Sequence, residues 1–160
     1  MKIAMISFTG NGRRLERSLA HELEKEGHQV LKCKELESDK DAVKCSAREW
    51  TGEQFRTRDV LIFIGAVQIA VRLIAPFIGS KTTDPAVLVL DEKGQYCIPI
   101  LSGHIGGANE LAERIVEMAG ALPVITTATD IRGKWAIDVF ARKNHFYIED
   151  MQKAKQRSEI

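Results

Sequence analysis

The segment LSGHIGGANE, residues 101–110, carries the residues best suited to chemistry in this 160-residue chain. Its polar and glycine residues are Ser102, Gly103, His104, Gly106, Gly107 and Asn109. A neutral imidazole can act as a general base near pH 7, and the backbone N–H groups of a glycine-rich loop can hold a carboxylate or a developing oxyanion. The segment is either a turn that joins a strand to a helix or a catalytic loop. The concentration of glycine, which lets a large ligand approach the backbone, favours the catalytic loop, with His104 as the base.

A second segment, SFTGNG at residues 7–12, joins an apolar run to a helical pattern. Exposed N–H groups and the positive end of a helix dipole would meet there, so Thr9, Gly10 and Asn11 are candidates to bind a phosphate or carboxylate. The segment resembles the T-G-N phosphate loop of flavodoxins. The alternative is a tight turn in which the glycines relieve backbone strain and Asn11 caps the helix.

Arg72, Lys81 and Asp84 supply charge near these loops. Arg72 lies in an otherwise apolar helical pattern, so it either extends to solvent or enters a crevice as an anion clamp. Lys81 and Asp84 belong to the segment SKTTDPA, which is either a polar turn before Pro85 or part of the site.

The segment VITTATD offers Thr126, Thr127 and Asp130 after a further apolar run. These residues either cap a following helix or exchange hydrogen bonds with a ligand. Asp84 and Asp130 are secondary candidates for catalysis.

Two other kinds of site are not supported by the residue spacing. His21, His28 and His145 lie in unrelated contexts and the three cysteines form no C-x-x-C pair, so no zinc site is predicted. No G-x-S-x-G motif is present, which argues against a serine-nucleophile hydrolase of that kind.

Hydrophobic periodicity predicts the elements that position these segments. We expect helices at 11–27, 46–55, 66–79 with an end or kink at Pro76, and from the 101–110 segment to Gly120. We expect strands at 2–8, 29–33, 59–65, 87–91, 96–100 and 123–130, with EKGQ making a hairpin between the fourth and fifth.

Strands that alternate with helices and are buried on both faces predict a three-layer α/β/α sandwich with a mostly parallel, flavodoxin- or Rossmann-like sheet. Ligands in such sheets bind at the carboxyl ends of the strands. We therefore expect the polar segments to converge there in one crevice.

The composition is that of an ordinary globular protein, with 44% hydrophobic residues, 28% charged residues and a net charge of +1. The net charge shows no basic excess of the kind that binds nucleic acid or membrane surfaces. No apolar run reaches the roughly 20 residues that span a bilayer. Three widely spaced cysteines and no leader pattern point to the cytoplasm. We expect one domain over residues 1–145 and a polar tail over 146–160.

Residues 65–130 resemble the amino-terminal region of the CbiG family, the cobalt-precorrin-5A hydrolases of anaerobic cobalamin biosynthesis. The resemblance is carried by IAVRLIAP, KTTDPAVLVLDE, LSGHIGGANELA and VITTATD, in this order along the chain. It departs from the family pattern at Gln68, where glycine is usual.

The resemblance implies a cobalt-bearing tetrapyrrole substrate, whose ring A δ-lactone is opened and whose C20 leaves as acetaldehyde to give cobalt-precorrin-5B. The cobalt would arrive within the substrate, so no separate cofactor is implied. His104 would be the base, loop N–H groups with Ser102 or Asn109 would stabilise charge, and Arg72 or Lys81 would bind substrate carboxylates. Family members have further regions beyond this point, which either a partner chain or a longer form of this protein would supply. A homodimer is the other assembly to consider.

Two alternatives remain open at the level of sequence. One is a flavodoxin-like electron carrier that binds FMN through SFTGNG, although the chain has only two Trp and two Tyr. The other is a non-catalytic corrinoid-binding domain.

Overall fold

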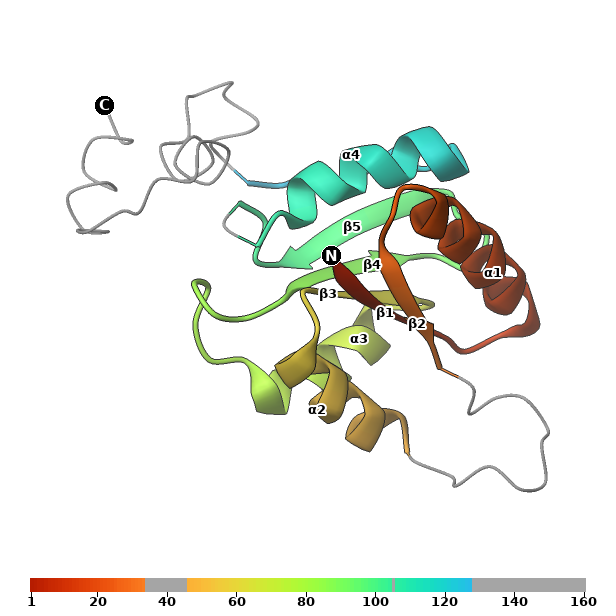
Figure 1. Ribbon diagram of the computed structural model, residues 1–160. Helices are drawn as coiled ribbons and strands as arrows, with labels where there is room; N and C mark the ends of the chain where they lie inside the picture. The colour runs from red at the N-terminus through yellow and green to blue at the C-terminus, as the bar shows by residue number, and fades with distance from the viewer. Residues whose placement is uncertain (34–45, 105, 128–160) are drawn as a thin grey trace, which may run out of the picture.

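The computed structural model describes residues 1–33, 46–104 and 106–127. Its centre is a six-stranded sheet in the order β2-β1-β3-β4-β5-β6 (Figure 1). The strands are β1 (Lys2–Ser7), β2 (Gln29–Lys32), β3 (Val60–Ile64), β4 (Ala86–Leu90), β5 (Tyr96–Leu101) and β6 (Leu122–Pro123). The helices are α1 (Gly10–Lys25), α2 (Ala47–Thr57), α3 (Val67–Ile74) and α4 (Ala108–Ala119), with a 3₁₀ turn at Ala75–Phe77. The predicted α/β sandwich is confirmed.

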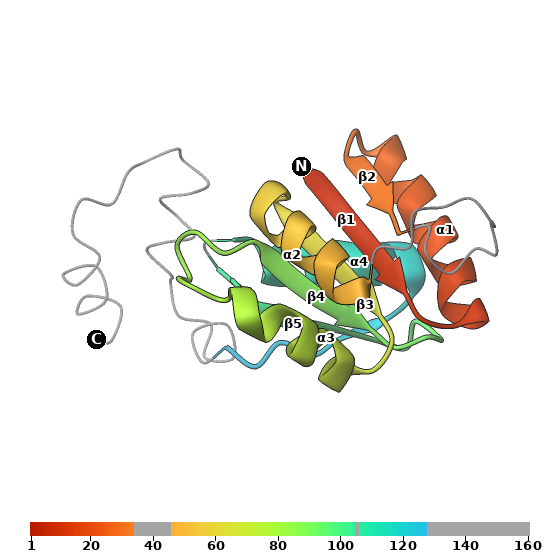
Figure 2. The same ribbon diagram turned by 90° about the horizontal axis from the view of Figure 1, so that it is seen from below.

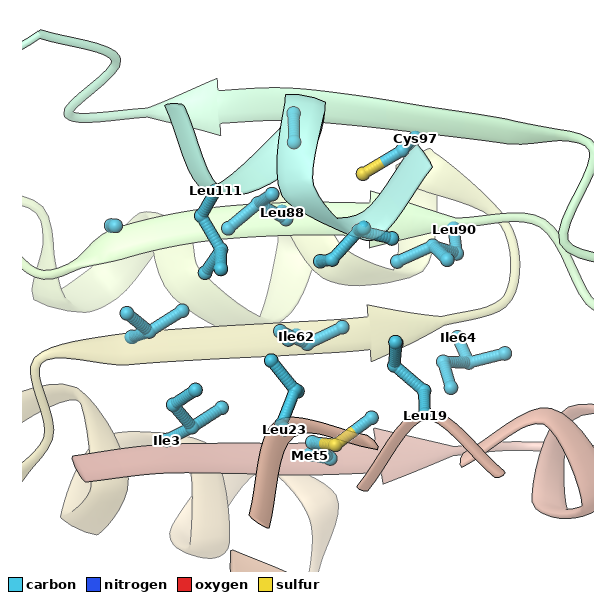
Figure 3. Close-up of a cluster of buried hydrophobic side chains, with 14 of the residues drawn as sticks. Ile3, Met5, Leu19, Leu23, Ile62, Ile64, Leu88, Leu90, Cys97 and Leu111 are labelled. Carbon is cyan, nitrogen blue, oxygen red and sulfur yellow. The ribbon is translucent and has the colours of Figure 1, made fainter. Parts of the chain in front are cut away.

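The helices form two layers, one on each face of the sheet (Figures 1 and 2). Leu19 and Leu23 of α1 and Leu111 of α4 pack on one face, against side chains such as Ile62 and Leu88 (Figure 3). Trp50 and Phe55 of α2 and Ala70 and Ile74 of α3 pack on the other face. Strands β3 and β4 are buried along their whole lengths, as their continuous apolar runs predict.

Local signals place the helix ends close to the predicted positions. Ser46 and Glu49 form a reciprocal capping box at the start of α2, which satisfies orphan N–H groups of the first turn. Pro76 ends α3 as expected, because its ring is tolerated only in the first turn of a helix. Gly120 ends α4 with φ of 70°, a left-handed conformation that glycine adopts without steric cost.

The strand expected at 123–130 is much shorter within the described part of the chain. Only Leu122 and Pro123 pair with β5, and Val124 adds one hydrogen bond from its N–H to the carbonyl of Cys97. Pro123 has no N–H to donate, and neither has Pro99 of β5, so the ladder loses donors on both strands. Residues 128–130, and with them Asp130, lie outside the described residues, as does the expected tail.

The sheet is not uniform in direction, and this separates the polar segments. Strands β1 to β4 are mutually parallel, but β5 runs antiparallel to β4, as the predicted hairpin requires. Leu101 at the end of β5 lies beside Val87 at the start of β4, and β6 runs parallel to β5. We call the end of the sheet where β1, β3 and β4 begin the amino edge, and the end where they finish the carboxyl edge.

The expectation of one crevice at the carboxyl ends is therefore wrong. SFTGNG lies at the carboxyl edge, whereas the segment that follows β5 and the turn before β4 lie together at the amino edge, the opposite end of the sheet in Figure 1. The reason is the reversed direction of β5, whose carboxyl end lies beside the amino end of β4. No helix of the described residues is long and apolar enough to cross a membrane.

Candidate functional site at the amino edge

The loop that joins β5 to α4 is held by its own backbone. The N–H of Gly107 donates to the carbonyl of His104 (3.1 Å), that of Ala108 to Ser102 (3.3 Å), and that of Asn109 to Gly103 (3.0 Å). Gly107 has φ of 81° and Ser102 has φ of 54°. A left-handed conformation is uncommon for serine and common at functional sites. The described residues of the loop are therefore held in one defined conformation.

Two glycines are required by close packing. A Cβ on Gly106 would lie 2.5 Å from the Cβ and 2.7 Å from the carbonyl oxygen of Ser102, and a Cβ on Gly103 would lie 2.8 Å from Oδ1 of Asn109. The packing of the loop therefore accounts for both glycines without any contact to a ligand. Ligand contact with this loop is therefore expected on its outer surface, around the half-buried His104.

Ser102 and Asp84 connect the loop to the turn before β4. The Ser102 hydroxyl donates to the carbonyl oxygen of Asp84 (3.0 Å), and the Asp84 carboxylate accepts the N–H of Gly79 at 3.2 and 3.0 Å. Since the Ser102 hydroxyl has only one proton, it cannot donate to an oxyanion while this bond is made. The structure thus brings Asp84 and Ser102 together, in bonds that fix the shape of the amino edge.

Asn109 joins the same loop to the segment after β6. Its side chain is 7% exposed, and its Nδ2 donates to Oγ1 of Thr127 (3.1 Å). Buried side-chain amides are nearly always hydrogen-bonded in proteins. This hydrogen bond holds Thr127 beside the loop. Thr126 is exposed next to it.

The two basic candidates are both exposed. Arg72 lies on α3, which packs on the sheet face opposite to α4, and Lys81 lies in the turn that precedes β4. Of the two alternatives for Arg72, the structure supports extension to solvent. Lys81 shares the amino edge with the loop, and binding of substrate by either residue stays a prediction.

The carboxyl edge holds Thr9, Gly10 and Asn11. Thr9 is the N-cap of α1, because its hydroxyl accepts the N–H of Gly12 (3.0 Å). The Asn11 side chain accepts a hydrogen bond from Arg14 instead, so the expectation that Asn11 caps the helix is wrong. Thr9 takes this role because it is the last residue with extended φ and ψ before the helix begins.

Glu16 is a buried acid that the sequence analysis missed. Its side chain lies on the sheet-facing side of α1 with 4% exposure, Oε2 accepts the hydroxyl of Ser7 (2.6 Å), and Oε1 has no hydrogen-bond partner among the described residues. Burial raises the pKa of this carboxyl, opposed by the Ser7 hydrogen bond and by Lys32, Arg17 and Arg13. The apolar periodicity of α1 gave a signal, since position 16 falls on the stripe of Leu19 and Leu23.

We expect Glu16→Gln to remove a pH dependence of stability. Because the pKa of Glu16 is higher in the folded than in the unfolded protein, its protonated form contributes fully to stability below the unfolded pKa. This contribution is lost as pH rises through the folded pKa. The free energy of unfolding in urea, measured at a series of pH values from the acidic to the neutral range, should fall more steeply with rising pH for the wild type than for Glu16→Gln. The exposed Glu53→Gln should follow the wild type, and equal slopes for Glu16→Gln and the wild type would contradict the assignment.

The fold and the amino-edge loop define a class: an α/β protein with a glycine-rich, histidine-bearing loop at the start of a helix. Within the described residues no cluster of three or more His, Cys, Asp or Glu side chains is arranged to hold a metal ion. The profile of the family described as cobalamin synthesis G N-terminal matches residues 49–130, which include the whole loop. The chain belongs to this family.

Individual relatives agree with the family. The chain is 49% identical over 102 residues to a cobalt-precorrin-5A hydrolase of Salmonella typhimurium, covering 64% of this chain and 29% of the relative. It is 46% identical over 91 residues to a cobalt-precorrin-5A hydrolase of Priestia megaterium, covering 57% and 24%. The matched region therefore spans less than a third of each relative's length.

A solved structure gives the same fold. The crystal structure of a cobalamin biosynthesis protein G homolog from Sulfolobus solfataricus superposes with a TM-score of 0.64 at 25% identity, over 99% of this chain and 45% of that chain. The comparisons support a role in cobalamin biosynthesis and give no support to the flavodoxin-like electron carrier.

Proposed function

We propose that this chain carries the cobalt-precorrin-5A hydrolase activity of its relatives, or forms the amino-terminal domain of such an enzyme. The observation that supports this most is the family match, which runs through the whole His104 loop and through the turn that Ser102 joins to it. The substrate in this proposal is a cobalt-bearing tetrapyrrole with a δ-lactone on ring A. The cobalt belongs to the substrate, and the reaction takes place in the cytoplasm.

The reaction has two steps with different demands. In the first, His104 removes a proton from a water molecule that attacks the lactone carbonyl, and backbone N–H groups of the loop stabilise the oxyanion until the ring ester bond breaks. In the second, a base removes the proton of the freed hydroxyl, its carbonyl forms, and the C–C bond to C20 breaks to release acetaldehyde. The macrocycle retains the electron pair of that bond and takes up a proton.

The surrounding residues have supporting roles in this proposal. Ser102 and Asn109 hold the loop in shape, because their side chains are bonded to Asp84 and Thr127. Gly103 and Gly106 allow the close packing that gives the loop its shape, and Gly107 takes the left-handed conformation that starts α4. Asp84, Asp130, Lys81 and Thr126 remain candidates for contact with the substrate.

Incubation of the chain with cobalt-precorrin-5A, with acetaldehyde trapped as its hydrazone, tests the proposal. We expect acetaldehyde in proportion to the corrinoid consumed. Binding of the corrinoid without acetaldehyde would favour a non-catalytic corrinoid-binding domain, and the same assay with added extracts of a longer family member would show whether a partner chain completes the site. Absence of both binding and release would contradict the proposed function.

A further inference from the structure

A cavity of about 400 Å³ lies beside the loop, on the sheet face that α1 and α4 cover. Its lining comes from the first residue of the chain, the connection between α1 and β2, and α4 with the residue before it: Met1, Glu26, His28, Gly107, Glu110, Leu111 and Arg114. A cavity of this volume is within the range of small-molecule sites. Gly107 belongs to both the cavity wall and the loop of His104.

The polar lining is organised around Glu26. One carboxylate oxygen, Oε1, accepts a hydrogen bond from the Arg114 guanidinium, and the other, Oε2, lies 3.8 Å from Nε2 of His28. Burial, and next the nearby amino group of the chain, lower the pKa of His28. The lowered pKa favours the neutral imidazole, and Arg114 is the cation on the α4 side of the cavity.

The charges and surfaces select one kind of ligand. A guanidinium has five N–H donors, so Arg114 can hold Glu26 and a second carboxylate together. Glu26 and Glu110 oppose a doubly charged group such as phosphate, whereas a single carboxylate is tolerated. Met1, which is 50% exposed, offers apolar surface to an aliphatic stem, and the nearly buried Leu111 adds a small apolar part of the wall.

We infer that this cavity binds a short aliphatic carboxylate of acetate or propionate size, with its carboxylate on Arg114 and its stem against Met1 and the edge of Leu111. The carboxylate is either that of a free acid or that of a side arm on a larger ligand held by the adjoining loop. The second case rests on the proposed function, since a corrinoid carries such arms, and the first does not.

Titration of the full chain with propionate, followed by two-dimensional ¹H–¹⁵N NMR, tests the inference. We expect saturable shifts at the amides of Gly107, Leu111 and His28. Arg114→Gln should weaken binding at least tenfold, which is about 1.4 kcal/mol. Glu26→Gln should strengthen binding several-fold, because it removes the carboxylate that competes for the guanidinium. Arg48→Gln, on the exposed side of α2, is the matched control and should bind as the wild type does.

Arg114→Lys keeps the charge and should retain part of the affinity, which separates loss of binding from loss of folding. The inference is overturned if propionate causes no saturable shifts at the cavity, or if Arg114→Gln binds propionate as well as Arg48→Gln does.

The source of the carboxylate is distinguished by a corrinoid with free carboxylate arms, cobyrinic acid, compared with its fully amidated form. If a side arm enters the cavity, Arg114→Gln weakens binding of cobyrinic acid and leaves the amidated form unaffected. If only propionate responds to the substitution, the ligand is a free acid. A chain that neither binds the corrinoid nor releases acetaldehyde, but binds propionate through Arg114, would refute the proposed function and support the cavity.

Discussion

Replacing His104 by alanine is expected to lower the rate of acetaldehyde release from cobalt-precorrin-5A by about 100- to 10,000-fold, the usual contribution of a positioned general base. The imidazole is half-buried in a loop whose backbone is fixed by hydrogen bonds from Gly107, Ala108 and Asn109. Since those bonds use only the backbone of residues 102–104, alanine should keep the loop conformation. Corrinoid affinity should therefore change much less than the turnover rate.

His21→Ala is the matched control, because His21 is exposed on α1 far along the chain from the loop. It should retain the wild-type rate. If His104→Ala also retained most of that rate while folding normally, another group would have to be the base, and Asp84 and Asp130 would be the next candidates.

Gly106→Ala is expected to destabilise the protein by about 1–3 kcal/mol, the usual cost of forcing an extra methyl group into a packed region. The new Cβ would meet the Cβ and carbonyl oxygen of Ser102, which the Asp84 contact and the α4 hydrogen bonds hold in place. The loop must shift to remove this steric clash, and the shift displaces His104. The rate of acetaldehyde release should therefore fall as well. The free energy of unfolding in urea and the rate of release measure the two effects.

Gly10→Ala provides the comparison for stability, because a Cβ at Gly10 meets nothing within 4 Å. Its free energy of unfolding should stay within about 0.5 kcal/mol of the wild type, as is usual for surface substitutions. Equal stabilities for the two variants would show that the loop adapts to the methyl group, and would contradict the fixed conformation.

Much of the fold could be predicted because local signals and tertiary packing agree. DVLIFIG predicts a strand buried on both faces, and β3 is buried throughout. Pro76 and Gly120 mark helix ends by simple backbone chemistry. The length of the last strand was overestimated, because Pro123 in its apolar pattern and Pro99 in the neighbouring β5 lack N–H donors. The missing donor on β5 cannot be seen in the sequence of the last strand itself.

The sequence named the residues of the candidate site but placed them at the wrong end of the sheet. The loop around His104 was identified by its glycines and by the resemblance, and the hairpin that reverses β5 was also predicted. Combining the two would have placed the loop at the amino edge, away from Thr9. The packing roles of Asn109 and Gly106, and the cavity at Arg114, depend on contacts between distant segments that no local pattern encodes.

The most direct test of the amino-edge site is hydrogen exchange of backbone amides in the presence and absence of cobyrinic acid. A corrinoid held by the loop should slow exchange at residues 102–104 and 106–109 and at the turn before β4, while residues 9–12 at the carboxyl edge exchange as before. Protection confined to residues 9–12 and 65–68 would place the ligand at the opposite end of the sheet and contradict the account.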